Sequence, residues 1–416
     1  MGKKRNNNKN SDGIAIPSKA GGANYTRDSD VSDLESIAYS SVAGDIDQRS
    51  NVDDEDSADG ILVDSFGEQI ENAQDKRVAI RNKAVANLNT LLKRCSIYET
   101  VEKWKQTLCD IIEKGLKRTP EEAIQVCPLA ALLCLHLGVE VEEAILDCLS
   151  IMRTIIADAS APEHLRSVCA QTIGLCVYLS CEQFDVRYDT LQTLKEVWST
   201  MKMTTAPSSL FAATISSWVL LLERCDTGLV SSIIDELQPK ICKYLESPSV
   251  DVRISAAEAL AVLHEVAVHD LDKNYRFANH NHLEQILGDL AVDSAKFHAK
   301  RDKRAQKFSL RQINDAIFND RMPQSQVKFN KREALQIEGC HTKLLYDSLC
   351  ILLKSDMNKH LTTNEVLREL FDLGPMVEDN EPLKSKDEKV ERMNYLGAVS
   401  KARNIRRAKQ RDRKAV

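Results

Sequence analysis

Several features that mark other protein classes are missing from this 416-residue sequence. No apolar run approaches the roughly 18–20 residues that cross a bilayer, and the longest candidates are segments such as 127–138, which His136 interrupts. The N-terminus, MGKKRNNNKN, has no apolar stretch to act as a secretory signal, and Asn6 stands where a myristoylation motif requires Ser or Thr. These absences predict a soluble protein of the cytoplasm or the nucleus.

Motifs for metal binding and catalysis are also missing. The twelve cysteines include no C-x-x-C pair, and most stand among aliphatic residues, so we expect reduced, buried thiols. His280 and His282 flank Asn281 in a polar connector without a nearby cysteine, which does not predict a metal site. The sequence has no phosphate-binding Gly-rich loop, no G-x-S-x-G and no H-E-x-x-H. It therefore predicts a protein that is not an enzyme and has no cofactor.

Charge is distributed unevenly along the chain, although the net charge is only −6. Residues 28–75 carry 15 acidic side chains and one basic one, Arg49, with few large apolar groups. Such a segment buries too little surface to offset its ordering entropy, so residues 1–75 are predicted to be a disordered head. Residues 401–416 hold eight Lys or Arg and one acid, Asp412. The chain is thus acidic at its head and basic at its tail.

The region between these ends shows a helical repeat. In the clearest unit, 237–265, a helix and a short turn precede a second helix that places apolar residues three and four apart, and Pro248 suits its opening. Related segments begin near 76 and 163, and their comparable arginines, Arg81, Arg166 and Arg253, are separated by 85 and 87 residues. Half of that spacing is about 43, within the HEAT and armadillo period.

The half-period positions hold further apolar helices, 120–138 and 207–223. Their amphipathic partners are 98–116, 140–157, 186–202 and 229–246. We read about five helical pairs over residues 76–291, and stacking of the pairs supplies the core. The predicted fold is all-α: a HEAT/armadillo-like solenoid with a small α-rich C-terminal module and disordered, charged termini. A helical bundle without repeats is the alternative.

A polar, irregular connector, 270–284, and a basic stretch, 296–311, follow the repeats. The basic stretch has seven Lys or Arg and one Asp. Like charges such as Lys300 with Arg304 weaken an isolated helix, and a polyanion would reverse that cost. A solvated helix face explains the same pattern equally well.

The remaining residues divide into a folded module and a tail. Segment 327–339 alternates in part, which fits short strands or an extended stretch. Residues 340–354 and Thr363 to Leu373 are predicted helices, the second with Asn364 or Thr363 as a cap and Gly374-Pro375 as its stop. The predicted organisation is a head, 1–75; repeats, 76–291; a basic segment with the C-terminal module, 292–376; and a basic, conditionally helical tail, 377–416.

Four C-terminal stretches carry a family resemblance: KRDKRAQKFSLRQI, KFNKREALQI, SLCILLKSDMNKHLTTNEVLRELFDLGP and NYLGAVSKARNIRRAKQRDRK. Together with the acidic head and the helical repeats, they resemble the interferon-related developmental regulator family over about residues 76–416. One departure is Met376, which stands where a second proline is expected after Leu-Gly-Pro.

The resemblance implies a non-enzymatic regulator of gene expression with an armadillo-type fold. Family members are described as ribosome-binding translational repressors, in which a basic C-terminal helix occupies the mRNA path, and as transcriptional coregulators that work with repressor complexes. The matching tail here is 394–414, and the resemblance leaves the choice between the two roles open. The implied partners are ribosomal RNA and proteins or corepressor complexes, and the implied locations are the cytoplasm and the nucleus.

The charges of the tail suit an RNA-walled path. A helix over 394–414 would carry cations on most of its circumference and only a narrow apolar stripe. Its repulsive i, i+4 pairs predict that it orders only when bound. A nuclear-import signal or a solvated basic end remains the alternative. The candidate RNA- or ribosome-binding residues are Lys401, Arg403, Arg406, Arg407, Lys409, Arg411, Arg413 and Lys414 in the tail, and Lys300, Arg301, Lys303, Arg304 and Lys307 in the basic stretch.

Overall fold

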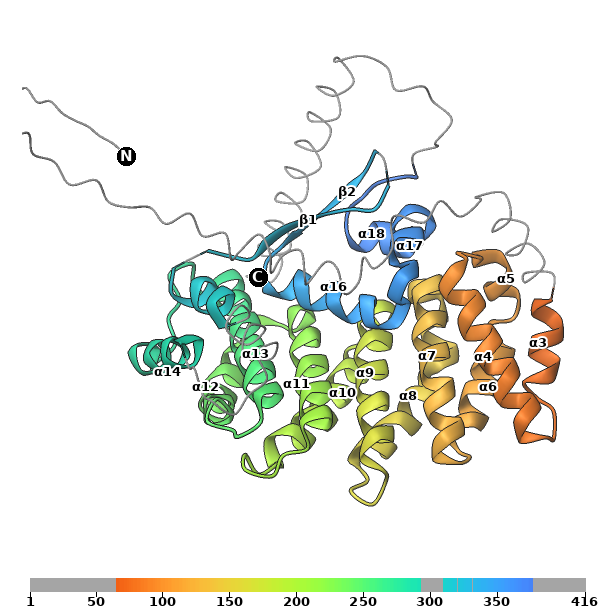
Figure 1. Ribbon diagram of the computed structural model, residues 1–416, viewed down its shortest axis with the longest axis horizontal. Coiled ribbons are helices and arrows are strands. Elements are labelled where there is room, and N and C mark those ends of the chain that lie inside the picture. Colours follow the sequence, from red (N-terminus) through yellow and green to blue (C-terminus); the bar gives the residue numbers. More distant parts are fainter. Residues whose placement is uncertain (1–64, 293–309, 320, 331, 377–416) are drawn as a thin grey trace, which may run out of the picture. The chain divides into compact units, whose positions relative to one another are not determined.

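A computed structural model describes residues 65–292, 310–319, 321–330 and 332–376, all of which lie in one compact unit. The predictions for residues 1–64, 293–309 and 377–416 lie outside the described residues. Figure 1 shows a row of paired helices, followed in the chain by a hairpin and helices that lie against the row.

Over residues 65–292 the helices form five pairs, with one further helix at the end of the row. The number of pairs matches the prediction, although the first helix of the first pair was not predicted. The helices are α3 (Phe66–Asn72) with α4 (Val78–Arg94); α5 (Tyr98–Lys103) and α6 (Lys105–Leu116) with α7 (Pro120–Leu137); α8 (Glu142–Ala157) with α9 (Glu163–Ser180); α10 (Phe184–Thr200) with α11 (Ser208–Leu221); α12 (Thr227–Tyr244) with α13 (Val250–Asp270); and α14 (His280–Val292).

The pairs stack in two layers. The inner layer consists of α4, α7, α9, α11 and α13, and each of these helices packs on the next; α6, α8, α10 and α12 form the outer layer in the same way. Inner helices are apolar on nearly all sides because they touch both their neighbours and the outer layer. Small residues bring them close together: a Cβ atom at Gly174 of α9 would lie 2.5 Å from Cβ of Ser217 in α11. The chain is therefore an all-α helical-repeat solenoid.

The repeated arginines share one structural role. Arg81 donates to the carbonyl oxygens of Asp75 and Lys76 at 3.0 and 2.8 Å. Arg253 donates to those of Ser247 and Pro248 at 2.7 and 3.3 Å. Each therefore closes the turn that precedes its own helix, and Arg166 similarly donates to the carbonyl of Ile156 at 3.0 Å. Charged donors satisfy carbonyls that the turn would otherwise bury without partners.

Contacts between successive repeats confirm the period of about 43 residues. The Sγ atoms of Cys127 and Cys169, 42 residues apart in sequence, lie 3.6 Å apart in the core. All twelve cysteines are free and nine are buried, as predicted. Burial raises the pKa of the Cys181 thiol to about 12. Buried thiols of this kind pack as small apolar groups rather than react.

The first pair corrects the predicted end of the disordered head. Residues 66–72 form α3, and Phe66, Ile70 and Ala73 are buried against the rest of the stack. Their spacing of four and three residues places them on one helix face, which the acidic composition of the whole segment concealed.

Three helix boundaries also differ from the predictions. The helix expected over 98–116 is broken at Trp104, whose backbone (φ −104°, ψ 8°) leaves the helical region. The connector 270–284 ends early because α14 begins at His280 and buries Leu283, Leu287 and Ala291 at spacings of four. Ser249, rather than Pro248, precedes the first residue of α13.

The stretch Pro120–Ala157 is apolar enough over an 18-residue window to span a membrane, contrary to the sequence reading. In the structure this stretch is not one helix but α7, a short 3-10 helix (Gly138–Val141) and α8, and 72% of the window is buried inside the protein. These helices form the core of the stack, and helices buried in a core pass the same length and composition test, so they are weak evidence for a membrane-spanning segment.

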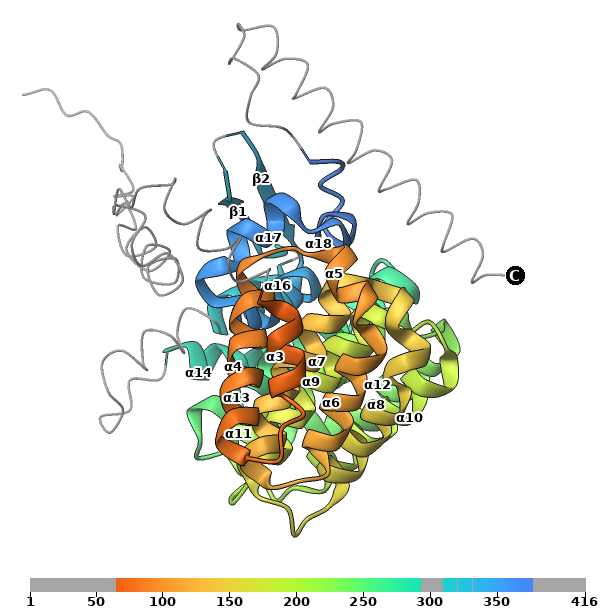
Figure 2. The ribbon, with the colours of Figure 1, turned by 90° about the vertical axis from the view of Figure 1, so that its right-hand side faces the viewer.

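The C-terminal module lies across the inner layer. Strands β1 (Gln324–Lys328) and β2 (Ala334–Glu338) form an antiparallel hairpin with Val327 opposite Leu335, which confirms the predicted short strands. Helix α16 (Cys340–Leu353) then runs across the inner helices, followed by α17 (Met357–Thr363) and α18 (Glu365–Leu370). The sequence predicted α16, and the helix predicted from Thr363 to Leu373 includes the whole of α18, but α17 was missed. In Figures 1 and 2 the hairpin, α17 and α18 lie together at one edge of the stack.

Candidate functional site

The predicted RNA-binding residues all lie outside the described residues. Their role therefore stays a prediction. The described residues show instead how the segment that precedes the tail is fixed to the solenoid. Five side chains do this: Glu265, His341, His360, Asn364 and Arg368.

The start of α16 is capped by a side chain from the inner layer. Oε2 of Glu265, in α13, accepts hydrogen bonds from the backbone N–H groups of Cys340 and His341 at 2.6 and 2.9 Å. A carboxylate at a helix N-terminus is favoured by the helix dipole. Gly339 makes the approach feasible, because its φ is +94° and a Cβ atom there would lie 2.1 Å from Oε1 of Glu265. Burial raises the pKa of Glu265, which the two backbone hydrogen bonds oppose.

His341 joins α16 to α11. Its Nε2 lies 2.9 Å from the carbonyl oxygen of Leu220, and its Nδ1 lies 3.3 Å from Oε2 of Glu223. The same Glu223 oxygen accepts a hydrogen bond from the hydroxyl of Tyr178 at 2.7 Å. A residue 121 positions along the chain thus satisfies a carbonyl at the end of an inner helix.

The other end of the module is fixed to the first repeats. Nε2 of His360 lies 2.8 Å from the carbonyl oxygen of Lys93 in α4, and its ring stands edge-on to His136, 5.5 Å away. Burial, together with the neighbouring His136, lowers the pKa of His360 to about 4. Asn364 has two roles: its Oδ1 caps α18 by accepting from the N–H of Leu367 at 2.8 Å, and its Nδ2 donates to the carbonyl of Leu135 at 3.1 Å.

Arg368 closes the module just before the tail begins. It is 3% exposed, and its guanidinium donates to both carboxylate oxygens of Glu333, at 2.7 and 3.3 Å. The guanidinium also donates to five carbonyl oxygens: Leu361 at 2.9 Å, Thr362 at 3.2 Å, Leu373 at 3.4 Å, Gly374 at 2.8 Å and Pro375 at 2.8 Å. We call Arg368, Glu333 and residues 373–375 the Arg368 clamp. It fixes the point from which the tail departs.

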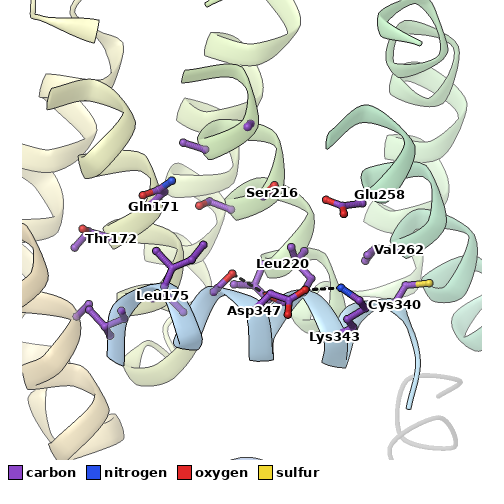
Figure 3. Close-up of a pocket in the computed structure, with 18 of the residues that line it drawn as sticks. Gln171, Thr172, Leu175, Ser216, Leu220, Glu258, Val262, Cys340, Lys343 and Asp347 are labelled. Carbon is purple, nitrogen blue, oxygen red and sulfur yellow. Dashed lines mark hydrogen bonds and ion pairs between the residues drawn. The ribbon is translucent and has the colours of Figure 1, made fainter. Parts of the chain in front are cut away.

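A cavity of about 450 Å³ remains between α16 and the inner faces of α7, α9, α11 and α13. Figure 3 shows Glu258 pointing into it opposite Lys343, which pairs with Asp347. Among the described residues, no donor hydrogen-bonds to Glu258, and burial raises its pKa to about 6 although Lys343 partly offsets this. The lining is otherwise mainly apolar, which suits binding of a side chain rather than bond-making chemistry.

Comparison with known proteins decides the family. A sequence model of "Interferon-related developmental regulator (IFRD)" matches residues 31–317, and one of "Interferon-related protein conserved region" matches residues 364–415. The chain belongs to the interferon-related developmental regulator family. The sequence resemblance is therefore confirmed, and so is the broad function of a regulator of development and gene expression.

Curated members of the interferon-related developmental regulator family are similar over most of their length. Interferon-related developmental regulator 1 from Homo sapiens is 32% identical over 355 residues, which cover 82% of this chain and 78% of that protein. Interferon-related developmental regulator 2 from Mus musculus is 30% identical over 376 residues, covering 87% and 85%.

Solved structures show only a weak likeness. An engineered protein (TM-score 0.40, 12% identity) is matched over 60% of this chain and 97% of its own, and a designed armadillo repeat protein (TM-score 0.36, 12% identity) over 59% and 99%. At these scores the likeness adds nothing to the fold derived from the helix contacts.

Sequence reasoning missed the residues that fix the C-terminal module. His360, Asn364 and Arg368 all stand in one of the stretches that carried the family resemblance, but only Asn364 received a role, as a helix cap. The missed signal is that three polar residues recur at spacings of four, which places them on the same helix face as the buried Met357, Leu361 and Leu367.

Proposed function

We propose that this family member is a ribosome-binding translational repressor whose basic C-terminal tail occupies the mRNA path. The observation that carries the proposal is that one family region, 364–415, runs without a break from the cap of α18 through the Arg368 clamp into the cationic tail. A rigid root followed by eight cations within 16 residues is the arrangement needed to direct a charged peptide into an RNA groove.

Binding by such a tail is electrostatic. Each phosphate that a Lys or Arg neutralises releases condensed counterions, so affinity falls steeply as salt rises. Like charges four residues apart, such as Arg403 with Arg407, oppose helix formation in the free tail, and phosphates around a helix would remove that repulsion. The basic stretch that holds Lys300 and Arg304 would add phosphate contacts. The proposed partners are ribosomal RNA and proteins, and the proposed locations are the cytoplasm and the nucleus.

Sedimentation through a sucrose gradient tests the proposal. At low salt the full chain should travel with 80S particles, because the tail neutralises ribosomal phosphates. Replacing Arg403, Arg406, Arg407 and Arg411 with Glu should release it to the top of the gradient. A full chain that stays at the top at low salt contradicts the ribosomal role.

A matched control separates tail binding from a general loss of positive charge. Lys83, Lys202, Lys240 and Lys273 are exposed cations on the solenoid, outside the module and the tail. Replacing these four with Glu changes the net charge by the same amount as the tail variant. The control should still sediment with ribosomes; its release would show that net charge, rather than the tail, drives binding.

The alternative is a nuclear transcriptional coregulator that uses the solenoid as a scaffold for corepressor complexes. The observation that favours it is the cavity beside Glu258, which offers a protein-binding site without RNA. In that case the tail variant should disturb nuclear entry, while partner pull-downs survive.

A further inference from the structure

Exposed apolar side chains gather in three adjoining turns of the solenoid and in the first residues of the helices that follow them. Of the seven large apolar residues that are exposed in the described part of the chain, four lie there: Tyr98, Val139, Phe184 and Tyr188. Phe184 is 54% exposed and stacks on Tyr188, with ring centroids 5.7 Å apart and an angle of 21° between the rings. We call residues 98–105, 138–143 and 181–189 the turn edge. A grouping of exposed aromatic residues is typical of an interaction surface.

Hydrogen bonds join the three turns into one surface. The hydroxyl of Tyr98 donates to the carboxylate of Glu140 in the next turn. Oε1 of Glu142 accepts from the backbone N–H groups of Glu182 and Gln183, both at 2.9 Å, in the turn after that. The turn edge is therefore continuous from α5 to the start of α10.

The turn edge is strongly acidic around its aromatic rings. It contains eight carboxylates and three cationic side chains, and seven of those eight carboxylates are exposed. The hydrogen bond to Glu140, with Glu102 and Glu365 nearby, raises the pKa of Tyr98 to about 12. This charge repels RNA, whose phosphates are also negative, and favours a cationic partner. Arginine suits the surface best, since its guanidinium both stacks on aromatic faces and pairs with carboxylates.

The root of the tail lies against the turn edge. A Cβ atom at Gly138 would lie 3.3 Å from Val366 of α18, so α18 is in contact with the middle turn. The Arg368 clamp then fixes residues 373–375, and 40 residues follow Met376. Forty extended residues reach on the order of 130 Å, so the tail is long enough to return to the turn edge. A linked peptide competes at an effective concentration in the millimolar range, which a free partner rarely matches.

We propose that, in the absence of a polyanion, the basic tail of this chain docks on the turn edge, with arginines over Phe184 and Tyr188 and among the surrounding carboxylates. While the tail is docked it is not available to RNA, so RNA binds only when the tail has left the turn edge. The inference requires that the tail binds a polyanion but not that the polyanion is ribosomal, so its failure is distinct from that of the ribosomal role.

The effect on RNA affinity follows from the docked fraction. If about 90% of the tails are docked, the apparent affinity for RNA is reduced about tenfold, because only the undocked fraction binds. A variant that cannot dock should regain that factor. An ordinary loss of RNA contacts would change the affinity in the opposite direction.

The first test measures binding of a fluorescein-labelled oligouridylate 20-mer to the full chain by anisotropy at low salt. The edge variant replaces Phe184 and Tyr188 with Ala, Glu182 with Gln and Asp185 with Asn. We expect it to bind RNA about tenfold more tightly than the unaltered chain. Affinity equal to or below that of the unaltered chain overturns the proposal, including the case in which the acidic residues of the head hold the tail instead.

The control variant removes the same two charges elsewhere. Glu121 and Glu196 are exposed carboxylates at the start of α7 and near the end of α10, at the opposite ends of these helices from the turn edge. Their replacement with Gln should leave RNA affinity within about twofold. A tenfold gain in this control would show that net charge alone explains the edge variant, and would overturn the proposal.

The second test identifies the occupant directly. The photoreactive amino acid p-benzoylphenylalanine replaces Tyr188 in the full chain, and crosslinked peptides are mapped after irradiation. We expect crosslinks to residues 394–416 of the same chain, independent of protein concentration and lost when the RNA 20-mer is added. Crosslinks only between two copies, only to other segments, or unaffected by RNA overturn the proposal.

Discussion

The Arg368 clamp predicts a large and local effect of a single substitution. Replacing Arg368 with Met removes every donor that the clamp supplies to Glu333 and to five carbonyls. Among the described residues, the side-chain donor that then remains for the Glu333 carboxylate is Nδ2 of Asn330, at 2.8 Å. Breaking a buried ion pair by removing one partner costs about 3–5 kcal/mol, because the remaining charge is uncompensated. We therefore expect the free energy needed to open residues 357–376 locally to fall by about 3–5 kcal/mol.

Hydrogen exchange read by mass spectrometry measures this opening, since amide protection reports local as well as global unfolding. The predicted loss corresponds to exchange faster by roughly 10²- to 10⁴-fold in peptides covering α17 and α18. Replacing exposed Lys328 of β1 with Met removes one cation from the same module and should leave protection unchanged.

A second substitution tests the cause of the loss. Replacing Glu333 with Gln in the Arg368→Met background removes the uncompensated charge, so it should restore about 2 kcal/mol of the lost protection. Protection that is unaffected by Arg368→Met, or a double variant as unstable as the sum of the single ones, refutes the reasoning.

Four further predictions concern neighbouring groups. The pKa of His360 is lowered to about 4, so between pH 4 and about 6.5 the folded state binds fewer protons than the unfolded state. The free energy of unfolding should therefore fall by about 2 kcal/mol from pH 7.5 to pH 5. His360→Gln should reduce this pH dependence in denaturant titrations, and an unchanged pH dependence contradicts the prediction. Burial raises the pKa of Glu258 to about 6, so at higher pH its buried charge lowers the free energy of unfolding. Glu258→Gln should therefore stabilise the protein by about 1–2 kcal/mol at pH 7.5 and by little at pH 4.5; equal effects at both pH values count against this. Gly339→Ala should increase hydrogen exchange at the start of α16, at a cost of about 2 kcal/mol or more, since it adds a Cβ atom against Glu265 at a positive φ; unaltered exchange there means that the cap is not needed. Truncation after Glu381 should leave thermal unfolding cooperative, because the clamp ends at Pro375; loss of cooperativity places core residues beyond that point.

The repeats were predictable because they are local. Helices such as α7 and α9 bury residues at spacings of three and four, and Pro120 and the repeated arginines lie near the start of the second helix of a pair. The helix boundaries near Trp104 and His280 were not predictable, since each depends on the backbone conformation of one residue. Helix α3 was hidden because its two buried apolar residues, Phe66 and Ile70, stand in a segment dominated by acidic residues.

The position of the C-terminal module could not be predicted from sequence patterns. His341 contacts Leu220 and His360 contacts Lys93 across separations of 121 and 267 residues. Periodicity reports which face of a helix is buried but not which distant surface covers it. The clamp was missed for the same reason, because Arg368 reads as an ordinary cation in the last turn of a helix. The turn edge also needed the fold, which brings three separate turns together.

The central claim is that the tail enters an RNA-lined path while the solenoid and its clamp hold its root. Crosslinking tests this most directly: p-benzoylphenylalanine at Ile405, within the tail, is irradiated in the full chain bound to purified ribosomes, and the attached RNA is sequenced. The account predicts crosslinks concentrated at ribosomal RNA that lines the mRNA path, and their loss when messenger RNA is bound first. Crosslinks scattered over the ribosome surface, or confined to residues of this chain, contradict it.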